Sequence, residues 1–194
     1  LTYLLSAGAG IGEVSMVFIP EMVRKSLYIS DPSIAGLMMM PVILAMAVGS
    51  PTAGRMLDKF GSKLVILVGT AVMTIGMILM SLLSTNMVGF IVSSLLIGIG
   101  LSALLGAPIR YIMLNESSEA DRSVAQGVAA LFTSSGQLLS RALVGAIAAS
   151  NGYPGAFLVI GLMGIGLIGL ATALKSRAEE ISIAKSNSIR SENQ

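Results

Sequence analysis

The chain has 194 residues, of which 54% are hydrophobic and 11% are charged, and its formal net charge is +2. Its 12 basic and 10 acidic residues are too few to cover the surface of a water-soluble protein and form no basic face for nucleic acid. Cysteine and histidine are absent, which argues against disulfides, thiolate metal sites and the common hydrolase triads. We therefore expect no enzyme and no metal, and carboxylates remain as the proton carriers.

Six apolar stretches follow one another along the chain. At about 1.5 Å per helical residue, each is long enough to cross a hydrocarbon core of about 30 Å. We expect an all-α integral membrane domain over residues 1–174 and a polar, disordered tail over residues 175–194. The predicted spans are Leu1–Val23, Ser33–Ala53, Leu64–Leu83, Val88–Leu114, Val124–Ala149 and Tyr153–Leu174.

Charge in the linkers predicts the orientation of the spans. Most basic residues fall on the side that holds residues 54–63, the linker 115–123 and the tail, whereas the other side has Arg24 and Lys25. The positive-inside bias assigns the first side, and with it the C-terminus, to the cytoplasm of a plasma membrane. Because Leu1 already lies inside an apolar stretch, we expect the chain to be a fragment of a longer protein.

The six predicted spans divide into two sets of three, residues 1–83 and 88–174, which begin on opposite faces of the membrane. This is the topology of the 3+3 inverted repeat that many secondary transporters contain. Any chain with six spans divides in this way, and the two sets share no convincing residue-level identity.

A charged segment, residues 54–63, separates the second and third spans and is predicted to be a tight turn. One of its glycines would let a helix end approach a neighbour, and the other would reverse the chain. The Asp and Lys residues place mixed charge at the headgroup boundary, where the Asp can face a helix N-terminus or an Arg. A solvated loop that stops translocation explains these residues equally well. The residues concerned are Gly54, Asp58, Lys59, Gly61 and Lys63.

The spacing Gly-x-x-x-Asp-Lys-x-Gly-x-Lys between the second and third of six spans resembles the signature loop of the major facilitator superfamily. Ser62 stands where that family commonly has a basic residue. The resemblance implies a fold of two six-helix halves, and the polar tail favours the C-terminal half. It also implies that Asp58, Lys59, Gly54 and Gly61 form a cytoplasmic latch, which holds the outward-facing state and is released during alternating access.

A second stretch begins at Asp121 and Arg122 and continues through Gly127, Ser134 and Gly136. It is similar to the penultimate-helix region of the drug:proton antiporter branch. The resemblance implies proton-coupled movement of a small hydrophobic or cationic solute, with drug efflux as the leading function and no bound cofactor. Uptake of a metabolite or sugar is the alternative within transport, and a non-transporting six-span scaffold is the alternative from another class.

Two ionisable residues lie at membrane depth, where an unpaired charge costs at least about 2.5 kcal/mol. Glu13 lies roughly 15 Å, and Arg141 roughly 12 Å, from the outer ends of their spans. The resemblance places both helices beside a central cavity. We expect Glu13 to be the proton-titrating or substrate-facing carboxylate and Arg141 to be its charge partner or an anion contact. A purely structural ion pair, or an Arg141 that reaches the outer interface, is the alternative.

A membrane-embedded half of a transporter is expected to have three kinds of partner. They are the lipid bilayer, a small-molecule substrate, and either the missing N-terminal half or a second copy of the chain. A lone half would expose a cavity face, so self-association in detergent is expected.

Overall fold

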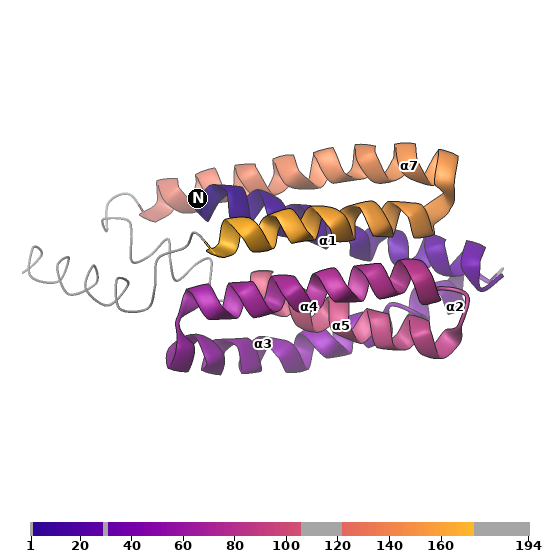
Figure 1. The fold of residues 1–194 in the computed structure, drawn as a ribbon, viewed down its shortest axis with the longest axis horizontal. Helices are drawn as coiled ribbons and strands as arrows, with labels where there is room; N and C mark the ends of the chain where they lie inside the picture. The colour runs from indigo at the N-terminus through magenta and orange to yellow at the C-terminus, as the bar shows by residue number, and fades with distance from the viewer. Residues whose placement is uncertain (1, 29–30, 106–121, 173–194) are drawn as a thin grey trace, which may run out of the picture.

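The computed structural model describes residues 2–28, 31–105 and 122–172, and every element in these ranges is a helix. Five helices in this part of the chain are long and apolar enough to cross a membrane, which confirms the predicted all-α membrane architecture. The helices lie side by side along the long axis of the molecule (Figure 1). They are α1 Thr2–Ser26, α2 Pro32–Leu37, α3 Met40–Phe60, α4 Ser62–Leu83, α5 Met87–Leu105 and α7 Arg122–Thr172.

Helix α7 has two arms that fold back on each other (Figure 1). Gly152 separates them, with non-helical φ 73° and ψ 173°. A residue with a side chain rarely adopts this region of φ/ψ space, so glycine permits the reversal. We call residues 122–151 the N-arm and residues 153–172 the C-arm. The predicted linker over residues 150–152 is thus reduced to a single non-helical residue.

The charged segment 54–63 is also largely helical, so the prediction of a turn over all of it is wrong. Helix α3 continues to Phe60 and α4 begins at Ser62. Buried Ala53 and Leu57 continue the apolar stripe of α3 and pack with residues of α4 and α5, which extends the helix. The predicted reversal at Gly61 is confirmed, because this residue has φ 84° and ψ 168°.

The second predicted span is interrupted near its start. Short helix α2 begins after Asp31, whose Oδ1 accepts a hydrogen bond of 2.8 Å from the Ser33 N–H. It ends at Leu37, and α3 begins at Met40 with Pro41 in its first turn. Proline lacks the N–H that would continue the helical hydrogen bonds, so it suits a helix start. The candidate membrane span Ser33–Phe60 therefore begins where the sequence predicted, but a two-residue turn at Met38 and Met39 divides its helix into α2 and α3.

Two groups of helices build the bundle. Helix α1 packs against α7, and α3 and α4 pack against α5, while α4 joins the two groups by packing against α7. A single main core runs through both groups and includes the fully buried Phe90 and Phe157. Asp121, the predicted fourth span beyond Leu105, most of the linker 115–123 and the tail 175–194 lie outside the described residues.

Candidate functional site

The most distinctive polar contact inside the bundle joins α1 to the N-arm of α7. Glu13 lies near the middle of α1 and is half-buried, with Gly12, Val14 and Ser15 buried beside it. Its Oε2 accepts a hydrogen bond of 2.8 Å from Nε2 of Gln137. The two residues are 124 positions apart in the chain, so only the packing of the two helices brings them together.

Two glycines bring the backbones of α1 and the N-arm into direct contact. A Cβ built on Gly10 would collide with the carbonyl oxygen of Thr133, and one built on Gly136 would collide with the carbonyl oxygen of Ala7. Ser140 Oγ adds a hydrogen bond of 3.3 Å to the Ile11 carbonyl. This close approach of small residues is what lets the Gln137 amide reach the Glu13 carboxylate.

The structure does not form the expected ion pair between Glu13 and Arg141. Arg141 lies four residues beyond Gln137 on the N-arm, and its side chain is exposed. Of the described residues, Gln137 is the one that bonds the Glu13 carboxylate. No role was assigned to Gln137 from the sequence. Its position one helical turn before Arg141 places it on the same helix face, which could have indicated it as an alternative partner for Glu13. The coupling roles of Glu13 and Arg141 stay predictions.

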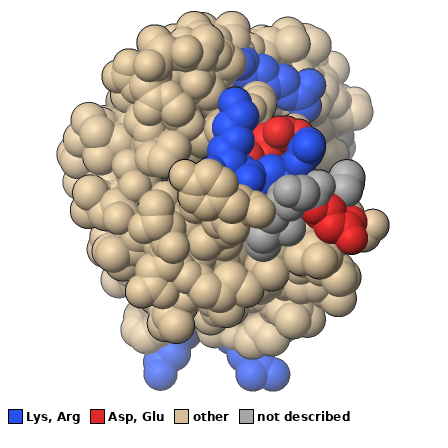
Figure 2. Space-filling view, turned by 90° about the vertical axis from the view of Figure 1, so that its right-hand side faces the viewer, with Lys and Arg blue, Asp and Glu red and all other residues tan. Residues whose placement is uncertain are grey.

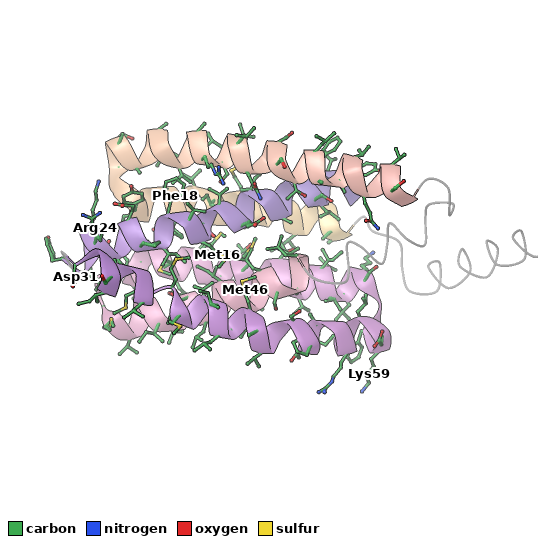
Figure 3. All side chains as sticks on the ribbon, turned by 180° about the vertical axis from the view of Figure 1, so that it is seen from behind. Met16, Phe18, Arg24, Asp31, Met46 and Lys59 are labelled. Carbon is green, nitrogen blue, oxygen red and sulfur yellow. The ribbon has the colours of Figure 1, made fainter. Side chains whose placement is uncertain are left out.

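The charged motif of residues 54–63 is arranged around Gly61. Asp58 and Lys59 are exposed in the last turn of α3, and Lys63 is half-buried in the first turn of α4. Figure 3 shows Lys59 pointing away from the bundle, with its Nζ 5.4 Å from the centroid of the Phe60 ring. This end of α3 therefore presents charge outward.

Gly54 departs from its expected packing role. A Cβ built on it would meet no described atom within 4 Å, so Gly54 does not allow a close helix contact within this part of the chain. Arg122 begins α7, and its side chain lies outside the description. The latch role and the cytoplasmic location of the motif of residues 54–63 stay predictions.

The opposite end of the bundle carries a small charged cluster around the end of α1. Arg24 Nη1 lies 3.3 Å from Glu21 Oε1, and Lys25 Nζ lies 5.0 Å from the centroid of the Tyr153 ring. Figure 2 shows basic and acidic side chains gathered in the upper part of this face, while most of the rest of the face is tan. Exposed ion pairs of this kind contribute at most about 1 kcal/mol. The cluster is therefore a poor candidate for a coupling site.

An apolar groove of about 410 Å³ lies between α3 and α4, over α5. Its two hydroxyl groups are used locally, since Thr52 donates to the Val48 carbonyl and Ser102 to the Ile99 carbonyl. The lining includes no ionisable residue. Within the described ranges no group of three or more Asp, Glu, His or Cys residues could hold a metal ion. The Glu13–Gln137 contact is therefore the better candidate for proton chemistry.

Comparison with known proteins gives two results. Residues 2–191 match the family model described as the Major Facilitator Superfamily. The chain is also similar to an uncharacterized MFS-type transporter, YfiU, of Bacillus subtilis (strain 168), with 29% identity over 130 residues. The aligned region is 66% of this chain and 24% of that relative, so the match spans about a quarter of the relative's length.

Proposed function

Since this chain belongs to the major facilitator superfamily, we propose that it is the C-terminal six-helix half of a proton-coupled secondary transporter. The membership supports transmembrane transport and an integral membrane location rather than enzymatic catalysis. Five described helices have the length and hydropathy for membrane crossing, and the two arms of α7 supply one crossing each in this proposal.

The packing of the helices supports a 3+3 inverted repeat. Let α1, α3 and α4 form the first set, and let α5, the N-arm and the C-arm form the second. Exchanging the two sets turns the contact of α1 with the N-arm into the contact of α5 with α3. In this exchange α1 corresponds to α5, α3 to the N-arm and α4 to the C-arm. The contact of α4 with α5 therefore corresponds to the contact of the C-arm with α1, and the contact between α4 and the C-arm corresponds to itself.

The observation that carries the coupling proposal is the hydrogen bond between Glu13 and Gln137. A half-buried carboxyl group in the middle of a membrane helix is costly, and such groups commonly serve proton or ion pathways. A cationic or hydrophobic solute suits the surroundings. Met16 lies one turn from Glu13 on α1, and Figure 3 shows Met16 and Met46 between α1 and α3. Methionine adapts to apolar ligands of varied shape.

Drug efflux is the substrate class and direction that we propose, and uptake of a metabolite or sugar is the second candidate. We further propose that the Gly61 end of the bundle faces the cytoplasm of a plasma membrane. The exposed faces of α3 and the N-arm are proposed to contact an N-terminal half or a second copy of the chain.

The test uses the full protein in proteoliposomes with an imposed proton gradient and a fluorescent cationic dye. Glu13→Gln should abolish gradient-driven dye transport, because a neutral amide cannot carry the proton. The matched control is Glu21→Gln, which removes an exposed carboxylate on the same helix and should leave transport unchanged. Coupled transport at the original rate in Glu13→Gln would contradict the assignment.

A further inference from the structure

We propose that Gln137 bonds Glu13 in both of its charge states, with the side-chain amide turning over when the carboxyl group gains or loses a proton. This inference rests on the proposed role of Glu13 as a proton carrier. It assigns Gln137 as a positioning residue for that proton. Arg141, the partner of Glu13 expected from the sequence, could not fill this role.

The chemistry of the two side chains supports this exchange. An ionised carboxylate only accepts hydrogen bonds, whereas a protonated carboxyl group also donates one. The amide of Gln137 has an NH₂ donor and a carbonyl acceptor on two ends of nearly the same shape. The NH₂ end lies 2.8 Å from Glu13 Oε2, which is the arrangement that an ionised, accept-only carboxylate requires. A half-turn of the amide presents the carbonyl oxygen, which matches the protonated state.

The geometry of the two helices confines the change to the side chains. Gly10 and Gly136 hold the α1 and N-arm backbones in direct contact, and Ser140 bonds the Ile11 carbonyl one turn away. The separation of the backbones is therefore fixed by packing. A bond that can reverse its polarity allows Glu13 to change charge without opening this contact.

Few other ionisable groups face Glu13 from the helices packed against α1. The described helices α2 and α5 carry none. Helix α7 carries Arg122 at its start, Arg141 and Tyr153, and Tyr153 lies at the far end of α1 beside Lys25 and Phe18. Arginine only donates, so Arg141 as a direct partner would favour the ionised carboxylate alone. Gln137 has no such preference.

Infrared difference spectroscopy of the full protein in lipid, recorded between low and high pH, tests this inference. The carbonyl band of protonated Glu13 is identified by its loss in Glu13→Gln. In Gln137→Met, which keeps the side-chain volume and removes both hydrogen-bonding ends, this band should shift to the frequency of an unbonded carboxyl group. The control Ser134→Ala, at an exposed position of the N-arm, should leave the band in place.

A second measurement does not depend on the folding of the Met variant. Isotope labelling of glutamine should reveal an amide band of the otherwise native protein that changes with the Glu13 band. Gln137→Asn, which keeps an amide on a shorter side chain, should remove that change. An unshifted Glu13 band in Gln137→Met, the absence of a pH-dependent Glu13 band, or the absence of a glutamine change would each overturn the inference.

The two proposals fail separately in these experiments. Coupled transport that survives in Glu13→Gln, together with a Glu13 band that responds to Gln137→Met, would reject the proposed function and retain the amide exchange. Transport that is lost in Glu13→Gln, together with a Glu13 band that does not shift in Gln137→Met, would retain the proposed function and reject the amide exchange.

Discussion

Gly61 and Gly152 share one backbone conformation at opposite ends of the bundle. Their φ and ψ angles are 84° and 168°, and 73° and 173°. Each glycine reverses the chain between two antiparallel helices without an intervening loop (Figure 1). In the proposed inverted repeat the two positions are equivalent, because α3 and α4 correspond to the two arms of α7. The two glycines therefore agree in backbone conformation, although the residues around them differ in sequence.

Replacing either glycine by alanine should destabilise the protein by about 1–3 kcal/mol, because this region of φ/ψ space is strained for a residue with a Cβ. Thermal unfolding in detergent, followed by circular dichroism, measures the effect for Gly61→Ala and Gly152→Ala. The control is Gly166→Ala in the C-arm, where a Cβ would meet no described atom within 4 Å. Equal unfolding temperatures for all three variants would contradict the role of these conformations.

The contact between α1 and the N-arm should be sensitive to a single methyl group. Gly136→Ala places a Cβ against the Ala7 carbonyl, and backbone atoms cannot move aside cheaply. We expect a loss of about 1–3 kcal/mol, as for other overpacked cores. Gly145→Ala, on the same arm but in open space, should be neutral or stabilising by up to about 1 kcal/mol. Comparable unfolding temperatures for the two variants would contradict the close approach.

Two buried threonines on α4 should respond oppositely to replacement by valine. Thr70 Oγ1 donates to the Ile66 carbonyl at 2.7 Å, whereas Thr74 Oγ1 has no hydrogen-bond partner among the described residues. Thr70→Val should therefore cost about 0.5–1.5 kcal/mol, and Thr74→Val should be neutral or stabilising. Guanidinium or thermal unfolding in detergent decides the order, and a larger loss for Thr74→Val would indicate a hidden partner.

Single cysteines can report the sidedness of the bundle, because this chain has no cysteine of its own. Lys59→Cys should react with a membrane-impermeant maleimide only after the cells are permeabilised, so that the reagent reaches the cytoplasmic side of the membrane. Tyr28→Cys, at a residue 90% exposed at the other end of the bundle, should react from outside intact cells. The labelling is done in a background free of other cysteines. The reverse pattern would invert the proposed orientation.

The sequence alone determined the membrane architecture and several landmarks within it. Long apolar stretches, the glycine reversal at Gly61 and the single acidic residue at depth, Glu13, are properties of short segments, so composition and spacing reveal them. The limits of the elements were less predictable. The segment 54–63 looked like a loop because of its charges, yet buried Leu57 keeps it helical through contacts with α4 and α5.

Only the tertiary structure decided which residues meet. Gln137 replaced Arg141 as the bonding partner of Glu13 because Gly10 and Gly136 set the approach of two helices whose residues lie far apart in the chain. Gly54, by contrast, resembled a packing glycine and faces open space in the described structure. Hydrophobicity is a property of each segment and can be read locally, whereas the distance and rotation between helices depend on every side chain in their shared contact.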